Sequence, residues 1–165
     1  MRTNRLWITL GCCFFAMPVF VLAQGRKAGL WELTSTQTFQ QAPPGMGAAA
    51  QGGGPRTTLV CLTQEQIDKY GAIVPQARGR ACEVINVVKT GDGMTADMVC
   101  TGPMSGKGHM ESHLTDADHA KGKVHFLGAI QAGPNAIPIE WTAESSSVFK
   151  GSDCGNVKPL FVPEK

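Results

Sequence analysis

Short segments rich in β-branched and aromatic residues recur along most of this chain, separated by turn residues, and they constrain its fold more than any other feature. The clearest pair, 83–89 and 94–100, flanks Thr-Gly-Asp-Gly, which has the composition of a β-hairpin turn. Further strands are expected at 30–39, 57–62, 109–115, 123–130 and 137–149. The sequence therefore predicts a mainly β fold, an antiparallel meander that is open or partly closed into a barrel-like sheet.

One short helix is expected after the strand at 57–62. Thr63 is followed three residues later by Gln66, which is the pattern of a capping box at a helix start. The helix is expected to be short and to end before Gly71.

The first 23 residues have the three-part pattern of a cleavable signal peptide. Arg2 and Arg5 form a basic start, an apolar run covers 6–21, and Val21-Leu22-Ala23 is a small-x-small cleavage pattern. The first mature residue is then Gln24. The sequence therefore predicts export from the cytoplasm.

Two alternatives to cleavage are less favoured. The apolar run falls short of the ~20 residues of a membrane-spanning helix, and Pro18 interrupts it. A lipid-modified cysteine would have to follow the whole run, whereas Cys12 and Cys13 lie inside it.

Residues 24–165 are expected to form a single domain with a flexible loop at about 40–56, where Gly, Ala and Pro dominate. Two of the 15 basic residues precede the cleavage site, so the mature chain has as many basic as its 13 acidic residues. Without a positive charge or a basic stripe, nucleic-acid binding is not expected. No later apolar stretch has transmembrane length.

Four cysteines remain after cleavage, and an even number in an exported chain indicates disulfides. They are Cys61, Cys82, Cys100 and Cys154. Pairing of Cys61 with Cys82 and of Cys100 with Cys154 is favoured, because these bonds would hold the helical segment and the C-terminal tail against the sheet. The competing possibility is a Cys82–Cys100 bond across the hairpin.

A set of short motifs in a fixed order resembles a bacterial exported family, the domain of unknown function 3617. The motifs are Gly29-Leu30-Trp31-Glu32, Cys61-Leu62-Thr63 with Glu65 and Gln66, Cys82, Cys100-Thr101-Gly102 and Cys154-Gly155. The resemblance spans nearly the whole mature chain. It implies a periplasmic protein of a Gram-negative bacterium, but no activity and no site residues.

Alternating residues of the expected strand at 109–115 provide a candidate metal site. His109, Glu111 and His113 share a face, and His125 would lie opposite His113 if the connecting loop centred on His119. Imidazole and carboxylate groups suit Zn²⁺ or Cu²⁺. The favoured interpretation is nevertheless an ordinary solvated face of an antiparallel sheet.

Methionines suggest a second metal. Met94, Met98, Met104 and Met110 carry soft thioethers that could bind copper(I). Because methionine also fills irregular gaps in cores, burial in the core is the preferred explanation.

No catalytic residue is assigned. The chain lacks GxSxG and HExxH, all four mature cysteines are expected in disulfides, and Asp116 with Asp118 has the composition of a turn. An enzyme is therefore not expected, and no cofactor is predicted.

Aromatic residues leave one question open. Trp31, Phe126, Trp141 and Phe149 are expected to build the core, or to line a cavity for an apolar ligand if the sheet curls. The preferred function is a non-enzymatic periplasmic module that binds an apolar ligand or an envelope protein. A metal-handling protein that uses the histidine hairpin is the alternative, and a hydrolase ranks third.

Overall fold

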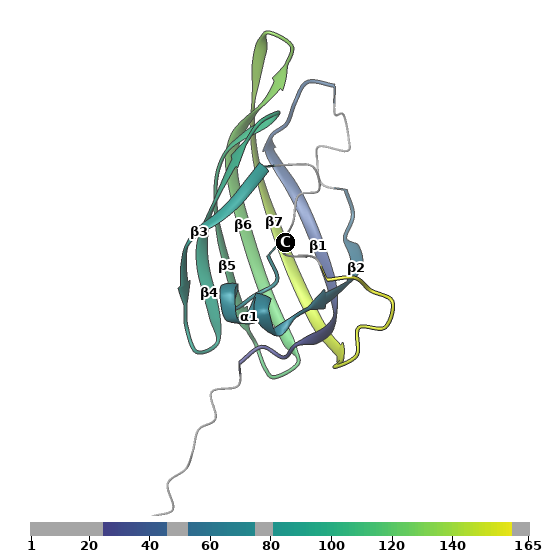
Figure 1. Cartoon of the computed structure of the whole chain (residues 1–165). Helices are drawn as coiled ribbons and strands as arrows, with labels where there is room; N and C mark the ends of the chain where they lie inside the picture. Colours follow the sequence, from purple (N-terminus) through teal and green to yellow (C-terminus); the bar gives the residue numbers. More distant parts are fainter. Residues whose placement is uncertain (1–24, 46–52, 75–80, 160–165) are drawn as a thin grey trace, which may run out of the picture.

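The computed structural model describes residues 25–45, 53–74 and 81–159. They form one seven-stranded antiparallel sheet of order β2-β1-β7-β6-β5-β4-β3 with one short helix (Figure 1). The elements are β1 (Gly29–Gln41), β2 (Arg56–Leu62), α1 (Gln64–Tyr70), β3 (Ala81–Lys89), β4 (Gly93–Thr101), β5 (Met104–Leu114), β6 (His119–Ala132) and β7 (Asn135–Gly151). The predicted mainly β, antiparallel fold is confirmed.

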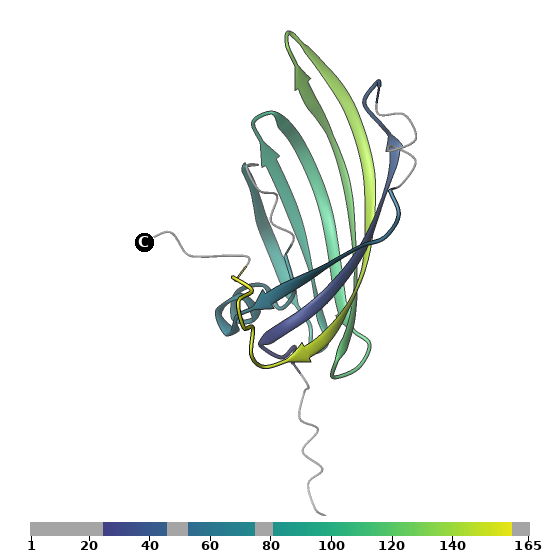
Figure 2. The same cartoon turned by 90° about the vertical axis from the view of Figure 1, so that its right-hand side faces the viewer.

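The chain order explains the sheet order. Strands β3 to β7 follow one another as a meander of antiparallel hairpins, and β1 then pairs with β7. The beginning and the end of the sheet-forming chain, β1 and β7, therefore pair inside the sheet, one strand in from the β2 edge. The two outer strands, β2 and β3, do not pair with each other, so the sheet is open. Figure 2 shows how strongly it curves, with long strands that bend around one concave side.

Helix α1 begins and ends where the sequence predicts. The Thr63 side chain accepts a hydrogen bond from the Gln66 backbone N–H, and the Gln66 side chain accepts one from the Thr63 N–H. Gly71 ends the helix at φ 74°. Lys89 Nζ donates to the Asp68 carbonyl, so the helix that follows β2 contacts the end of β3. Helix α1 therefore links β2 and β3, the two edge strands of the open sheet, at one end of the molecule.

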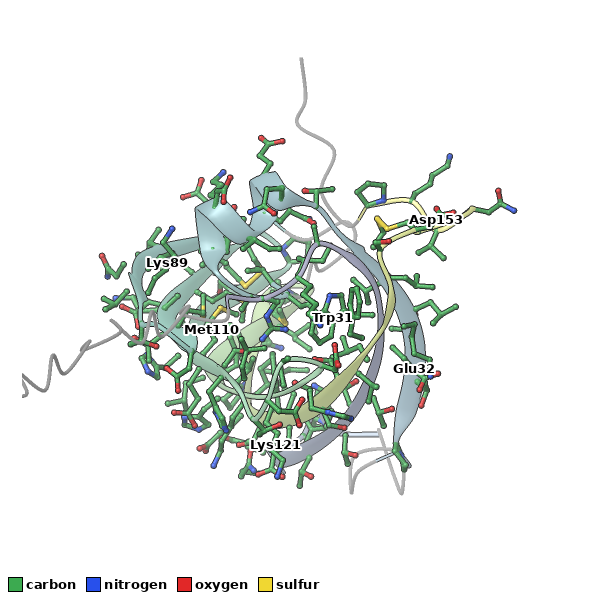
Figure 3. The ribbon with its side chains drawn as sticks, turned by 90° about the horizontal axis from the view of Figure 1, so that it is seen from below. Trp31, Glu32, Lys89, Met110, Lys121 and Asp153 are labelled. Carbon is green, nitrogen blue, oxygen red and sulfur yellow. A yellow bond between two sulfur atoms is a disulfide. The ribbon has the colours of Figure 1, made fainter. Side chains whose placement is uncertain are left out.

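The core lies on the concave side. Figure 3, a view from below, shows the strands curling around a central mass of side chains that includes Trp31 and Met110, while Glu32 points away. Trp31 and Phe126 are fully buried, and all four methionines that could suggest a copper site are buried. The interpretation of Met94, Met98, Met104 and Met110 as core residues is confirmed.

The disulfides differ from the favoured pairing. Cys61 bonds Cys154, and Cys82 bonds Cys100. The prediction of Cys61–Cys82 and Cys100–Cys154 is wrong because β2 and β3 lie on opposite edges of the sheet. Cys82 and Cys100 are direct partners in the β3–β4 register, and the chain after β7 returns beside β2, where Pro159 bridges Cys61.

The expected loop at about 40–56 needs correction, and part of it, like the predicted signal peptide, lies outside the described residues. Strand β1 continues to Gln41 and β2 begins at Arg56, so the segment between them is shorter than 40–56; residues 46–52 lie outside the described ranges. The predicted signal peptide, residues 1–23, also lies outside them. No helix in the described ranges is long and apolar enough to cross a membrane.

Candidate binding site

A hollow of about 230 Å³ opens on the concave side of the sheet, and we call it the inner hollow. Its apolar wall comes from β1, β4, β5, β6 and β7, through Leu33, Met94, Met110, Val124, Trp141 and Ala143. Its polar residues include Arg26, Ser112, Ser145 and Ser147. The inner hollow is thus mainly apolar with a few polar groups, which is the usual character of a small-molecule site.

A row of small residues explains why the inner hollow exists. Ser112 on β5 lies opposite Gly122 on β6, Gly122 lies opposite Ser145 on β7, and Ser145 lies opposite Ser35 on β1. Side chains of one such row all face the same side of the sheet. Four neighbouring strands therefore each place a small side chain at the same level of the concave face. The space that larger residues would fill stays open.

A second hollow of about 370 Å³ adjoins the first. The two share Ser35, Gln37 and Trp141 as lining residues. The second hollow continues along the concave face past Phe39 and Ile139. Together they provide an elongated space rather than a compact one.

Arg26 is the buried charged residue of the inner hollow, whereas Glu111, Lys121 and Lys123, which also border it, are exposed on the outer face. The side chain is only 7 % exposed, and burial lowers the pKa of its guanidinium to about 10, so it stays charged at neutral pH. Nη2 donates a hydrogen bond of 2.9 Å to Ser112 Oγ, and the guanidinium lies 5.2 Å from the Trp31 ring centroid. Nε is buried without a hydrogen-bond partner among the described residues.

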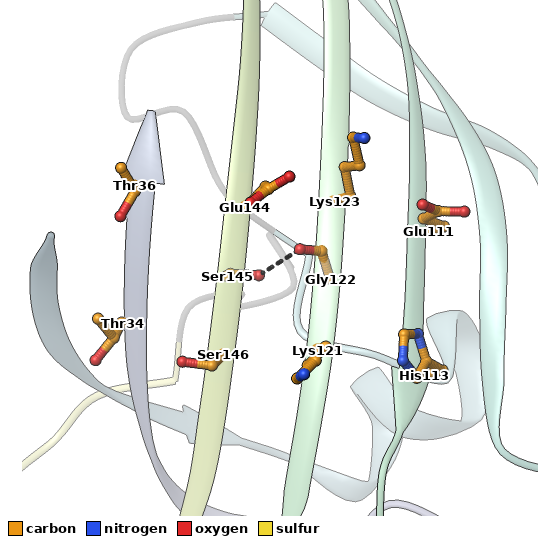
Figure 4. Close-up of a pocket in the computed structure, with 10 residues that line it drawn as sticks. All are labelled: Thr34, Thr36, Glu111, His113, Lys121, Gly122, Lys123, Glu144, Ser145 and Ser146. Carbon is orange, nitrogen blue, oxygen red and sulfur yellow. Dashed lines mark hydrogen bonds between the residues drawn. The ribbon is translucent and has the colours of Figure 1, made fainter. Parts of the chain in front are cut away.

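The opposite face of the sheet carries a larger depression of about 440 Å³, lined by residues with polar side chains and by Gly122 (Figure 4). Two cross-strand rows line it: His113–Lys121–Ser146–Thr34 and Glu111–Lys123–Glu144–Thr36. Ser145 reaches it only from the edge, by donating a 3.3 Å hydrogen bond to the Gly122 carbonyl. Alternating opposite charges on a solvated strand face need no ligand to explain them.

The four metal candidates all lie on this outer face, in an arrangement that differs from the expected one. His125 lies opposite His109, and His113 lies opposite Lys121, because the hairpin centres on Ala117 rather than on His119. The Asp116 carboxylate tightens that turn by accepting the Asp118 backbone N–H at 2.8 Å.

Carboxylates accompany two of these imidazoles. Nδ1 of His109 lies 3.0 Å from Asp97, and Nε2 of His125 lies 2.8 Å from Glu140. The pKa of the Asp97 carboxyl is lowered, most by its hydrogen bond with Asn86 and next by its hydrogen bond with His109. Within the described ranges, no three His, Cys, Asp or Glu residues are grouped so that they could hold a metal ion.

Sequence reasoning did not single out Arg26 or the row of small residues. Arg26 precedes the first strand and belongs to no motif. Small residues on four strands look unremarkable until the register aligns them. The aromatic residues gave a usable signal, because Trp141 was expected either in the core or against a cavity, and it lines both hollows.

One family model matches the chain. It is described as a protein of unknown function, DUF3617, and covers residues 26–154. No curated protein and no solved structure matches the chain significantly.

Proposed function

This chain belongs to the DUF3617 family, and we propose that it is an exported, non-enzymatic binding module that holds an apolar ligand on the concave face of its curled sheet. The observation that carries the proposal is the row Ser112–Gly122–Ser145–Ser35, which keeps a hollow open inside a face that is otherwise packed.

Three properties of the hollow support ligand binding over a packing defect. Cores are normally filled to high density, and apolar cavities reduce stability. The inner hollow adjoins a second one of about 370 Å³, so the space is elongated. Its wall combines the flat ring of Trp141 with flexible side chains such as Met94 and Met110, which adapt to different apolar shapes.

Two disulfides support the exported location. Cys61–Cys154 and Cys82–Cys100 form where the compartment is oxidising, as the periplasm is. A cleaved signal peptide would deliver the chain there. The periplasm is the compartment that we propose.

The test measures binding of N-phenyl-1-naphthylamine, a neutral apolar fluorophore whose emission rises in apolar surroundings. Ala143→Phe places a large ring in the inner hollow, and the matched control Thr142→Phe places it on the outer face, because neighbouring strand residues point to opposite sides. We expect Ala143→Phe to weaken binding by about tenfold or more and Thr142→Phe to leave it unchanged.

Both variants are compared with the parent by thermal unfolding, so that a loss of binding is separated from a loss of fold. Ser145→Leu, in the row of small residues, fills the same space from a different position. Failure of the parent protein to bind the fluorophore, or equal binding by all variants, would overturn the proposal. Native mass spectrometry of the exported protein then identifies any ligand carried from the cell.

Metal handling stays a second candidate, because His109 and His125 are cross-strand neighbours. Calorimetric titration with Zn²⁺ and Cu²⁺ tests it against the double variant His109→Ala/His125→Ala. Sub-micromolar binding that disappears in the double variant would place metal handling first.

A further inference from the structure

Arg26 is a buried cation that has no counter-charge among the residues the structure describes. Its side chain is only 7 % exposed, and no carboxylate forms an ion pair with it in the described ranges. Removing a charged group from water costs several kcal/mol unless an opposite charge or a full set of hydrogen bonds compensates it. Protein groups supply only part of that compensation here.

The contacts that do form leave one edge of the guanidinium open. Ser112 Oγ accepts from Nη2, and the guanidinium carbon lies over the ring of Trp31, 5.2 Å from its centroid. Nε is the described chain's one buried side-chain polar atom without a hydrogen-bond partner. A guanidinium binds carboxylate and phosphate oxygens through paired N–H donors, and Nε belongs to one such pair.

Arg26, which carries this unpartnered Nε, forms part of the wall of the inner hollow. Arg26 lines the hollow together with Ser112 and Ser147, whereas Val124, Trp141 and Ala143 line it with apolar surface. A molecule that occupied the hollow would meet a cation and hydroxyls beside a wall of apolar side chains. That combination matches an amphiphile with an anionic head group.

We propose that Arg26 is the head-group anchor of the inner hollow and that the ligand is an anionic amphiphile, with a carboxylate or phosphate head on the guanidinium and an apolar tail along the concave face. This inference rests on the proposed function, because it names the ligand class for the same hollow. The apolar tail would extend past Trp141 toward the adjoining hollow, which shares that residue.

The experiment compares three ligands of one chain length: decanoate, decyl phosphate and decanol. Each displaces bound N-phenyl-1-naphthylamine from the exported protein. We expect decanoate or decyl phosphate to bind at least about tenfold more tightly than decanol. The tighter of the two anions identifies the head group as a fatty-acid carboxylate or as a phosphate ester.

Charge variants localise the effect. Arg26→Gln removes the cation, and Lys107→Gln removes an exposed cation on the outer face of β5 as the matched control. We expect Arg26→Gln to weaken anion binding about tenfold, to leave decanol binding within about twofold, and Lys107→Gln to change neither. Arg26→Lys keeps the charge without the fork of donors and is expected to give an intermediate affinity.

Different results mark the two possible failures. Equal affinity of the parent for decanol and both anions, or full anion affinity in Arg26→Gln, overturns the anchor while apolar binding stands. Absence of any binding, of the fluorophore as of all three ligands, overturns the proposed function itself.

A second measurement needs no variant, in case Arg26→Gln does not fold. Carbon-13 NMR of [1-¹³C]decanoate on the parent protein follows ionisation of the bound head group. Contact with the guanidinium stabilises the carboxylate, so its pKa in the complex is expected to fall below that of free decanoate. A bound pKa equal to or above the free value overturns the anchor.

Discussion

Phe126 on β6 and Trp141 on β7 lie directly opposite each other, with ring centroids 5.3 Å apart and planes inclined by 20°. Phe126 is fully buried, whereas Trp141 lines both hollows of the concave face. The stacked pair is therefore the boundary between packed core and open space. The buried ring of Phe126 supports Trp141 from one side, so the pair forms one wall of the proposed site.

Glycines make room for the buried member of this pair. A Cβ at Gly128 would lie 2.7 Å from Phe126 and 2.2 Å from the Ser105 carbonyl oxygen. Since a backbone atom of the neighbouring strand cannot move aside, Gly128→Ala is expected to lower the free energy of unfolding by about 2 kcal/mol or more. Gly91→Ala is the matched control, since no atom lies within 4 Å of its added Cβ.

Urea unfolding followed by circular dichroism measures both variants. The control is expected to change stability by no more than about 0.5 kcal/mol. Equal stabilities for Gly128→Ala and Gly91→Ala would mean that β5 and β6 tolerate a side chain at this level.

The two disulfides are expected to contribute unequally to stability. Cys61 and Cys154 are 93 positions apart, whereas Cys82 and Cys100 are 18 apart. In the chain-entropy account, a bond that closes a loop of ~100 residues stabilises by about 4.7 kcal/mol and one that closes ~15 residues by about 3 kcal/mol. Cys61→Ala/Cys154→Ala is therefore expected to be more destabilised than Cys82→Ala/Cys100→Ala.

Peptide mapping under non-reducing conditions checks the connectivity before the stabilities are compared. It is expected to yield a Cys61–Cys154 peptide and a Cys82–Cys100 peptide. Recovery of Cys61 linked to Cys82 would contradict the strand order, because those residues lie on the two outer strands.

Local signals in the sequence predicted most of the elements, because each depends on neighbouring residues. The capping box of Thr63 and Gln66 and the turn at Gly91 fix a helix start and a hairpin without reference to the rest of the fold. The open, curled character of the sheet was one of two forms expected. Faces of strands were also predictable, since period-two alternation places Ile139 and Trp141 on one side.

Relationships between distant segments could not be predicted in the same way. The pairing of β1 with β7 places β2 at the edge opposite β3, and that order alone decides which cysteines meet. Register had the same effect on the histidines, because a loop centred two residues earlier moves His125 from His113 to His109. Arg26 could not be singled out from the sequence, because its role depends on its position at the hollow on the concave face of the sheet.

Export is expected to remove the first 23 residues. A small-x-small pattern ends at Ala23, so mature protein should begin at Gln24 and lack both Cys12 and Cys13. Intact-mass measurement of periplasmic protein checks the cleavage point, with whole-cell protein as the control. A mass that includes Met1, or an added acyl chain on Cys12, would contradict it.

The Asp116 turn is expected to make folding sensitive to acid. A hydrogen bond from the Asp118 backbone N–H, and then one from His119, lowers the pKa of Asp116 from its ordinary value of 3.8. Because the folded state binds this proton less readily than the unfolded chain does, the turn stabilises the fold above pH 3.8 and loses that effect as pH falls through the lowered value. NMR titration of the side-chain carboxyl is expected to give a midpoint below 3.8.

Asp116→Asn keeps an oxygen that accepts the Asp118 N–H but cannot titrate, so its stability should vary less with pH in this acid range than that of the parent. Asp116→Ala removes the acceptor as well and should be less stable than Asp116→Asn at neutral pH. A parent midpoint at or above 3.8, or the same acid dependence in Asp116→Asn as in the parent, would show that this carboxylate does not hold the turn.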